Sequence, residues 1–113
     1  MIVVIKRMDI RWVELENKGS IQSGMRPCLI ISNQVACVYS PTLVVVPITT
    51  ATKRDLPTHM NINLKKPSTA LFEQLLTVNK EQIYERISCL PEHQYKETEE
   101  KIKISLGLTP AYA

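Results

Sequence analysis

This chain has few of the residues that small proteins use for cross-links, metal sites or large aromatic cores. Its 113 residues include three cysteines, two histidines and three glycines, and only 5% of them are aromatic. An odd number of cysteines without Cys-x-x-Cys spacing indicates neither a disulfide framework nor a zinc site. Cys28 and Cys89 lie in apolar runs, and we expect both to be small core residues rather than nucleophiles. With so few aromatic residues, the core must consist mainly of valine, isoleucine and leucine.

Long apolar runs are also missing. No stretch approaches the roughly 18 apolar residues of a membrane-spanning helix. The apolar residues 1–5 precede Lys6 and Arg7, which reverses the charged-then-apolar order of a secretory signal. We therefore expect no membrane association and a cytoplasmic location.

Length and charge set further bounds. The chain suits a single domain over residues 1–113, and 44% of it is hydrophobic, which is enough for a real core. A domain of this size buries a modest share of its surface, so pairing into a homodimer would help it. The net charge of +3 is uneven, with +5 in residues 1–66 and −2 in residues 67–113. A basic half favours a partner that carries phosphate groups.

Hydrophobic patterning predicts five to seven short strands, one-turn helices between them and one C-terminal helix. We expect an α+β fold: a small, partly open antiparallel β-barrel with a helix across it. In the first strand, Ile10, Trp12 and Leu15 should face the interior. Pro47 should mark a bulge or an edge, because proline donates no hydrogen bond to a sheet. The predicted strands cover residues 9–15, 27–31, 42–49, 59–64, 69–78 with a break near Glu73–Gln74, and 86–90; the helical turns cover 34–38 and 80–83, and the terminal helix begins at Pro91 and ends at Gly107.

Familiar catalytic motifs are absent. The chain has no phosphate-binding Gly-x-x-x-x-Gly-Lys loop, no Gly-x-Ser-x-Gly elbow and no His-Glu-x-x-His helix. Neither histidine has ligand-like neighbours, so we expect no metal and no cofactor. His59 begins a strand beside a polar loop, residues 50–57, and is a candidate acid–base group.

Two strand–loop boundaries remain as candidate sites. Arg26 leaves the loop of residues 16–24, and Thr49 ends the central strand. Pro27 biases Arg26 away from helical conformation and would present the guanidinium in a set direction. On these observations alone, Arg26 is most simply an ordinary surface arginine beside a strand.

Several segments in order resemble the MazF/PemK family of toxins. The segment Lys6–Leu15 resembles the family's Lys-Arg-Gly-Asp opening, and Gly19–Pro27 is similar to its Gly-Ser-Glu-Gln-x-Gly-x-Arg-Pro signature. The match continues, in sequence, through Ser32–Asn33, Ser40–Thr42, Val46–Thr50, Leu56–His59 and Leu71–Gln74. It spans about residues 4–108, nearly the whole chain.

The resemblance implies an SH3-like or CcdB-like barrel that acts as a metal-independent, sequence-specific endoribonuclease on single-stranded RNA, chiefly mRNA. Its catalytic residues would be Arg26 and Thr49. The ribose 2′-hydroxyl would attack the phosphate, so DNA should not be cut. The resemblance also implies a cognate antitoxin as partner of a type II system, a homodimer, and DNA binding only through the antitoxin. The implied RNA contacts are Gly19, Ser20, Gln22, Ser23, Asn33, Lys53, Arg54, Glu73 and Gln74.

This sequence departs from the family pattern at several positions. Ile21 stands where the family usually has glutamate, Met8 replaces a glycine, and Leu76 stands where arginine is common. A missing carboxylate at position 21 leaves the general base open, with His59, Glu73 or the RNA itself as substitutes.

Two alternatives stay open. One is a CcdB-like inhibitor of DNA gyrase, although those proteins end in Trp-Gly-Ile and this chain ends Thr109–Ala113. The other is a catalytically weakened barrel that binds RNA or a protein partner, which Ile21 favours.

Overall fold

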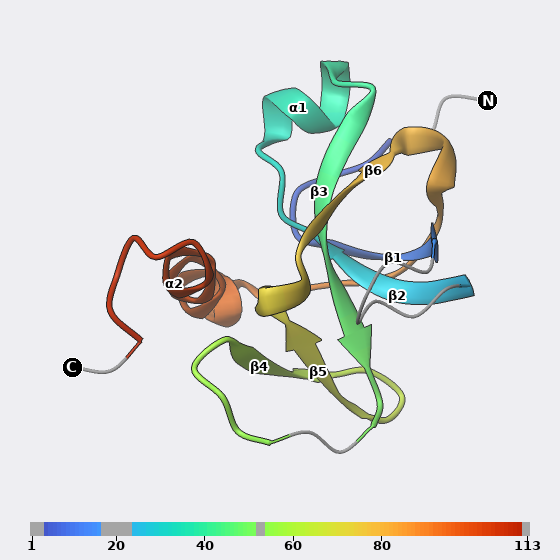
Figure 1. The fold of residues 1–113 in the computed structure, drawn as a ribbon. Helices are drawn as coiled ribbons and strands as arrows, with labels where there is room; N and C mark the ends of the chain where they lie inside the picture. The colour runs from blue at the N-terminus through green and yellow to red at the C-terminus, as the bar shows by residue number, and fades with distance from the viewer. Residues whose placement is uncertain (1–3, 17–23, 52–53, 112–113) are drawn as a thin grey trace.

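The computed structural model describes residues 4–16, 24–51 and 54–111. Within these ranges the fold is built from short strands, two α-helices and three single 3₁₀ turns (Figure 1). The strands are β1 (Asp9–Leu15), β2 (Gly24–Ile30), β3 (Thr42–Thr49), β4 (His59–Asn63), β5 (Pro67–Leu71), β6 (Leu76–Asn79) and β7 (Ile83–Cys89). The helical segments are α1 (Gln34–Tyr39), η1 (Phe72–Gln74), η2 (Lys80–Gln82), η3 (Glu92–Gln94) and α2 (Tyr95–Ser105).

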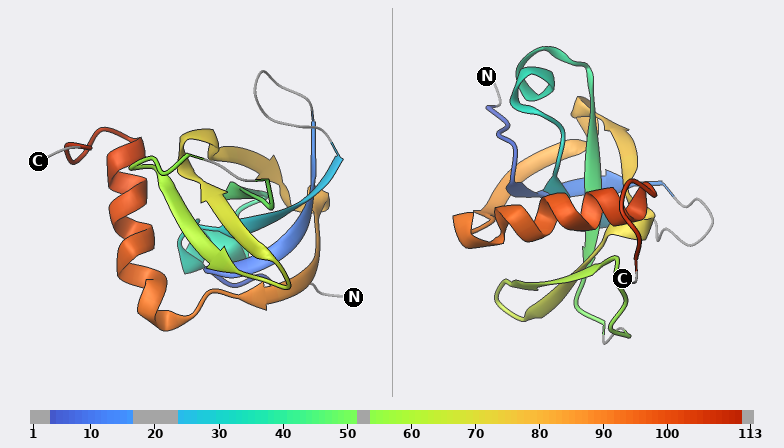
Figure 2. Two further views of the ribbon diagram at one scale, coloured as in Figure 1. Left: turned by 90° about the horizontal axis from the view of Figure 1, so that it is seen from below. Right: turned by 90° about the vertical axis from the view of Figure 1, so that its left-hand side faces the viewer.

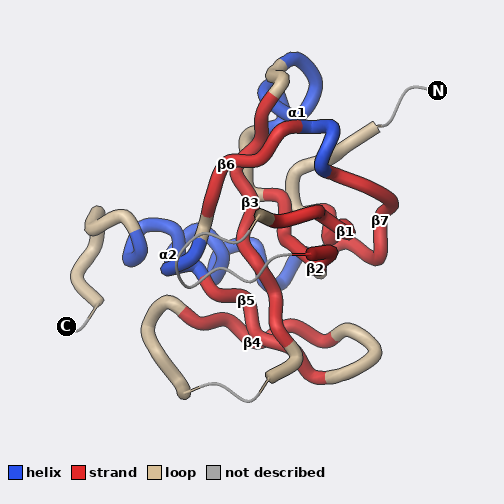
Figure 3. Tube along the Cα trace, turned by 45° about the vertical axis from the view of Figure 1, so that its right-hand side comes forward, coloured by secondary structure: helices blue, strands red, loops and turns tan. Residues whose placement is uncertain are grey.

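The strands form one antiparallel sheet in the order β4-β5-β3-β2-β1-β7, and β6 pairs with β3 outside this path. The expected α+β class and antiparallel pairing are confirmed. The described strands do not close into a barrel, since β4 and β7 lie at opposite ends of the pairing path. In Figure 3 the β4–β5 hairpin lies at the bottom of the view, and β1, β2 and β7 lie to the right of β3.

Strand β3 organises the sheet, and its predicted bounds are confirmed. One edge of β3 pairs with β2 through Cys28–Pro47. The other edge pairs first with β6, up to Val45, and then with β5, from Ile48 onward. Pro47 therefore lies between the part of β3 that pairs with β6 and the part that pairs with β5. Proline has no backbone N–H to donate, and on this edge of β3 no ladder hydrogen bond is lost at that position. The 3₁₀ turn η1, between β5 and β6, makes the change possible, and it coincides with the predicted break in residues 69–78.

Two apolar clusters lie on opposite faces of the sheet. The first contains Phe72 and the inward residues of β4 and β5, and Ile102 of α2 packs against it. The second contains Cys28, Val45 and their neighbours beneath α1. Helix α2 lies along one side of the molecule next to β4 (Figure 2). The helix therefore covers the first cluster. Phe72 is the one aromatic residue among the described core residues, and most of the others are valine, isoleucine or leucine, as the composition predicts.

The terminal helix differs in detail from the prediction. Pro91 precedes the turn η3, so it is not the first residue of α2. Thr98 is fully buried and donates a hydrogen bond to the Gln94 carbonyl (2.9 Å), whereas Tyr95 and Leu106 are exposed. The sequence pattern predicts one apolar stripe of Tyr95, Ile102 and Leu106 with Thr98 between them, and only part of this stripe faces the core. None of the described helices is long and apolar enough to cross a membrane.

Two expectations about individual side chains are wrong. Trp12 is 37% exposed, because Arg11 takes the buried place beside Ile10 and shifts the alternation of β1. Cys89 is exposed, because β7 is an outer strand with little packed over it.

Met8 is buried with φ 74°, a left-handed conformation that glycine adopts more easily. The backbone at residue 8 thus keeps the conformation that a glycine would favour.

Candidate active site

Arg26 and Thr49 lie on neighbouring strands at the same end of the sheet. The β2–β3 ladder ends at Cys28 and Pro47, and its register, continued by two residues, places Arg26 opposite Thr49. Because side chains alternate along a strand, both share a face with Cys28 and Pro47. Both side chains are partly exposed. The continued register thus puts an arginine and a threonine at the same open end of the β2–β3 ladder.

A local hydrogen bond orients the hydroxyl of Thr49. Its Oγ1 accepts a hydrogen bond from the Ala51 backbone N–H at 3.1 Å. A hydroxyl that accepts here keeps its own proton to donate elsewhere. On the other strand, Gly24 begins β2 with φ 100°, a conformation that suits glycine. Gly24 therefore directs the chain into the short stretch that carries Arg26.

Two further strands extend the same face. Thr49 pairs with Thr69 of β5, and Thr69 pairs with Asn61 of β4. Directly opposed residues project to the same side of a sheet. Hydroxyl, hydroxyl and amide groups therefore follow one another across the sheet, starting next to Arg26. Sequence reasoning missed Thr69 and Asn61 as site residues, although the alternation His-Met-Asn-Ile-Asn already separated Asn61 from the core-facing Met60 and Ile62.

His59 and Glu73 join the loop after β3 to the turn η1. His59 is buried; its Nδ1 lies 2.6 Å from the Arg54 carbonyl oxygen and its Nε2 lies 2.9 Å from Glu73 Oε2. Thr58 Oγ1 donates a second hydrogen bond to Glu73, at 2.9 Å. A carbonyl oxygen accepts only, so Nδ1 must carry a proton. If Glu73 is ionised, Nε2 must carry one too, and the ring is an imidazolium.

The carboxyl of Glu73 is the ionised partner. Burial raises its pKa, but hydrogen bonds from His59, from its own backbone N–H and from Thr58 outweigh burial, so the net pKa is lowered. Neither nitrogen of His59 is then directed toward a substrate. The arrangement makes His59 a clamp on the loop, and it gives no support to His59 as an acid–base group.

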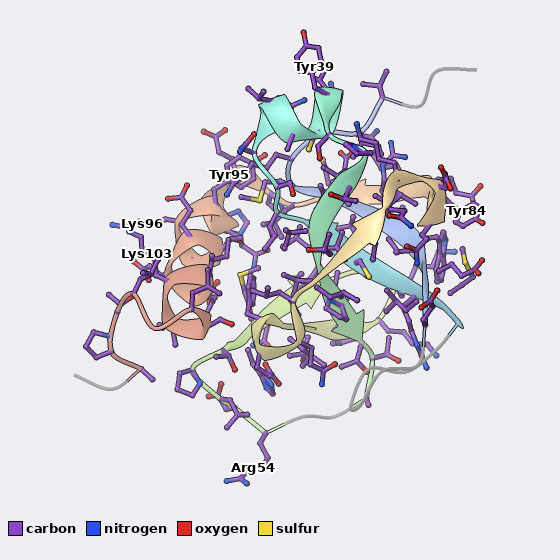
Figure 4. The ribbon with its side chains drawn as sticks, turned by 45° about the horizontal axis from the view of Figure 1, so that its top comes forward. Tyr39, Arg54, Tyr84, Tyr95, Lys96 and Lys103 are labelled. Atoms are coloured by element: carbon purple, nitrogen blue, oxygen red, sulfur yellow. The ribbon has the colours of Figure 1, made fainter. Side chains whose placement is uncertain are left out.

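The remaining predicted RNA contacts divide into three groups. Gly19, Ser20, Gln22, Ser23 and Lys53, together with Ile21, lie outside the described residues. Arg54 points away from the body of the molecule, and Gln74 lies next to Glu73 in η1 (Figure 4). Asn33 is not brought to this end of β3: it caps α1, where its side chain accepts from the Ala36 N–H at 2.8 Å. Figure 1 shows α1 at the far end of β3.

Other chemistry has little support here. Burial raises the pKa of the Cys28 thiol to about 12, so this thiol is no nucleophile at neutral pH. In the described ranges, no three His, Cys, Asp or Glu side chains gather closely enough to hold a metal ion. The described site thus offers one fixed positive charge and several neutral hydrogen-bonding groups.

Comparisons with known proteins show the family of this chain. The model of the PemK-like, MazF-like toxins of type II toxin–antitoxin systems matches residues 6–106. Endoribonuclease EndoA of Bacillus subtilis (strain 168) is 34% identical, and the alignment covers 94% of this chain and 97% of that protein. MazF from Deinococcus radiodurans superposes with a TM-score of 0.81 at 19% identity, covering 93% of this chain and 98% of the other. An endoribonuclease in complex with its cognate antitoxin, from Mycobacterial species, gives a TM-score of 0.75 at 18% identity, covering 96% and 98%. This chain therefore belongs to the PemK-like, MazF-like family of type II toxins.

Proposed function

We propose that this protein is an endoribonuclease that cuts single-stranded RNA, chiefly mRNA, at a short preferred sequence and without a metal. The observation that supports the proposal is the register of β2 and β3, which, continued two residues beyond its last pair, puts Arg26 opposite Thr49. The similarity to an endoribonuclease at 34% identity over nearly the whole chain supports the same activity.

The proposed reaction uses the RNA as its own nucleophile. The 2′-hydroxyl attacks the adjacent phosphorus, a 2′,3′-cyclic phosphate forms, and the 5′-oxygen of the next nucleotide leaves with a proton. Negative charge builds on the non-bridging oxygens in the transition state, and a guanidinium fork stabilises that charge. Arg26 takes this role because its charge is permanent. Thr49, whose oxygen accepts from Ala51, donates its proton to a phosphate oxygen.

Proton removal from the 2′-hydroxyl is the step with no obvious protein base among the described residues. His59 has both nitrogens engaged. A carboxylate with a lowered pKa that already accepts two side-chain hydrogen bonds, as Glu73 does, is a weak base. The described residues therefore act mainly by positioning the phosphate and stabilising its charge, and the RNA's own groups or solvent take up the proton.

Single-turnover cleavage of a defined RNA in EDTA tests the proposal. Wild type should cut and leave a cyclic phosphate or 3′-phosphate and a 5′-hydroxyl. Arg26→Ala should lose about a hundredfold or more in rate, the usual loss when one charge-stabilising donor is removed from an active site. An RNA with deoxyribose at the cut position is the matched substrate control and should stay whole. Cleavage of the deoxy substrate, or full activity in Arg26→Ala, would overturn the mechanism.

The same experiment separates the alternatives. Intact RNA with tight binding would identify a weakened, RNA-binding domain, and inhibition of gyrase would identify a gyrase poison. The family match supports the nuclease over the gyrase inhibitor.

We also propose that the protein acts in the cytoplasm as a homodimer held by a cognate antitoxin, through which alone the complex would bind DNA. The family is defined by such systems, and the Mycobacterial relative carries its antitoxin. Co-expression with the neighbouring reading frame, followed by native mass measurement, tests this. A lone monomer at micromolar concentration would contradict it.

A further inference from the structure

The side-chain amide of Gln82, the last residue of η2, makes a hydrogen bond at each of its two ends. Its Oε1 accepts from the Asn79 backbone N–H at 2.9 Å, and its Nε2 donates to the Glu14 carbonyl at 2.8 Å. The first bond is local and sets the direction of the planar amide. The second bond spans 68 positions of the chain and reaches the end of β1. The turn η2 therefore presents a donor of fixed direction to β1.

This bond lies where the pairing of β1 with β7 stops. That ladder ends at Val13 and Ile83, and its register, continued by one residue, places Gln82 opposite Glu14. At residue 82 the backbone belongs to η2 and not to a strand. A side-chain amide therefore satisfies the Glu14 carbonyl in place of a strand N–H.

A gap beside Gln82 shows what this bond adds. The gap has a volume of about 220 Å³ between the end of β1 and the segment formed by β6 and η2, and its lining includes Leu15, Leu76 and Gln82. Protein interiors normally leave few voids larger than a water molecule. Packing is thus incomplete here, and the amide of Gln82 fixes a strand end that packing alone would hold loosely.

The position of Arg26 depends on this end of β1. Val13 is opposite Arg26, and Glu14 is opposite the residue before it. The β2–β3 ladder starts only at Cys28, so residues 24–27 of β2 pair with β1 and not with β3. A shift of Glu14 would therefore move the backbone that carries Arg26.

Thr49 is connected to the same bond from the other direction. Its strand β3 pairs with β6, and β6 leads directly into η2. The Lys80 N–H donates to the Pro41 carbonyl at 3.0 Å, which fastens η2 to the start of β3. Through Gln82, η2 joins β1, and β1 joins β2. The connected elements β3, β6, η2, β1 and β2 therefore link Thr49 to Arg26.

We infer that Gln82 is a positioning residue for the proposed cleavage: its amide holds the end of β1, and β1 holds Arg26 in place relative to Thr49. Gln82 itself touches no reacting atom. The inference rests on the proposed ribonuclease function, because Arg26 is the group that Gln82 positions. A small displacement of a charge-stabilising group slows the chemical step more than it weakens binding, because the transition state depends more strongly on geometry.

Three variants of Gln82, compared by kcat and KM on a defined RNA, test the inference. Gln82→Met keeps the length of the side chain and removes both hydrogen bonds, so kcat should fall about tenfold while KM changes less than about twofold. Gln82→Lys keeps a donor for the Glu14 carbonyl, so kcat should stay within about twofold of wild type. Gln82→Glu keeps the acceptor but places a carboxylate against that carbonyl, so it should be as slow as Gln82→Met. Full activity in Gln82→Glu would mean that only the bond within η2 matters, and it would overturn the inference.

Gln34→Met is the matched control. Gln34 is an exposed glutamine whose side chain also bonds a distant backbone group, the Arg7 N–H at 3.0 Å, but it lies on α1 at the far end of β3 (Figure 1). Its kcat and KM should stay within about twofold of wild type. An equal fall of kcat in Gln34→Met and Gln82→Met would mean that any lost hydrogen bond slows the enzyme, and it would overturn the inference.

A double mutant shows whether Gln82 acts through Arg26. In an Arg26→Ala background, Gln82→Met should lower the remaining single-turnover rate little further, because the group that Gln82 positions is gone. A full tenfold loss in that background as well would contradict a route through Arg26.

Amide hydrogen exchange, followed by NMR, gives a measure that needs no catalysis. In Gln82→Met the amides of residues 13–15 and 24–26 should exchange about tenfold faster, whereas those of β4 and β5 should keep their wild-type rates. No acceleration would show that Gln82 does not hold the end of β1, and equal acceleration in every strand would show a general loss of stability. Either result would overturn the inference.

Failure of the inference and failure of the nuclease give different results. If wild type cuts RNA and Gln82→Met cuts it equally fast, the positioning role is overturned and the nuclease stands. If wild type cuts no RNA, the nuclease is overturned. Faster exchange confined to residues 13–15 and 24–26 would then still show that Gln82 holds the strand end on which Arg26 depends.

Discussion

Two side-chain pairs, Arg11–Asp9 in β1 and His59–Glu73 between β4 and η1, differ in how far solvent reaches the carboxylate. Arg11 Nε lies 3.2 Å from Asp9 Oδ2 in the β1 region, and their side chains are 8% and 4% exposed. His59 Nε2 lies 2.9 Å from Glu73 Oε2 beside the active site, with side chains 7% and 38% exposed. Both side chains of the first pair are buried, whereas solvent reaches the carboxylate of the second pair.

Both cations also hold backbone carbonyls from distant segments. Arg11 donates to the carbonyls of Tyr84 in β7 (2.9 Å) and of Val4 before β1 (2.8 Å). His59 donates to the carbonyl of Arg54 in the loop after β3. Arg11 thus joins β1 to β7 and to the segment before β1, whereas His59 joins the loop after β3 to η1. In the second pair the ionisable carboxyl is the partly exposed Glu73, whose pKa is lowered by its hydrogen bonds.

Asp9→Ala should have the largest effect, because it leaves a buried arginine without its counter-charge. We expect a loss of about 3–5 kcal/mol in the free energy of unfolding, measured by urea denaturation. The backbone N–H of Lys6, which donates to Asp9 at 3.1 Å, also loses its acceptor.

Glu85→Ala is the matched control, an exposed carboxylate on β7. It should change stability by no more than about 0.5 kcal/mol. If Asp9→Ala and Glu85→Ala lowered the free energy of unfolding equally, the buried Arg11–Asp9 pair would stabilise the fold no more than an exposed carboxylate does.

Much of this fold is readable from hydrophobic periodicity, but β1 and β7 show its limit. The bounds of β1 and β3 and the turns near residues 34, 73 and 80 follow from local patterns. Period-2 alternation fails in β1 because the charged residues Asp9 and Arg11 are buried, although the alternation of Ile10 with Trp12 assigns them to the exposed face. The start of β7 was missed because an outer strand, exposed along most of its length, carries little hydrophobic signal.

The site shows a similar division. The prediction that Arg26 and Thr49 are the catalytic residues rests on motifs of the family, because their local sequence is not unusual. Asn61 and Thr69 were missed because their importance depends on register between strands distant in sequence. Cross-strand register is set by turns and by core packing, and no window of local sequence contains it.

His59→Ala should have an intermediate effect on stability. Its kinetic constants distinguish a residue that positions the loop from an acid–base group. Losing a buried ring with two hydrogen bonds should cost roughly 1–2 kcal/mol of stability. If His59 positions the loop, KM for RNA should rise severalfold while kcat changes little. His93→Ala, the same change at an exposed position, should leave stability and both constants within error.

A fall in kcat in His59→Ala with KM unchanged, together with loss of one limb of the pH–rate profile, would instead identify His59 as an acid–base group. That result would mean that the two hydrogen bonds of His59 do not keep its ring from the reaction.

The smallest effect concerns pH. The pKa of Glu73 is lowered from its usual 4.5, after its hydrogen bonds with His59, its own backbone and Thr58 outweigh the effect of burial. A carboxyl with a lowered pKa stabilises the fold fully above the unfolded-state pKa, and this stabilisation is lost as pH falls through the folded-state pKa. The stability of wild type minus that of Glu73→Gln should therefore be constant near neutral pH and shrink in acid, below about pH 4.5.

Because more than a third of the Glu73 side chain is exposed, solvent screening should keep this difference below about 1 kcal/mol. Urea unfolding from about pH 3 to about pH 7 measures it. Repeating Glu73→Gln in the His59→Ala background removes the principal hydrogen bond that lowers this pKa, so the acid-dependent part should diminish. An equal pH dependence in both backgrounds would mean that His59 does not hold the Glu73 carboxylate, and the contrast with the buried Arg11–Asp9 pair would then fail.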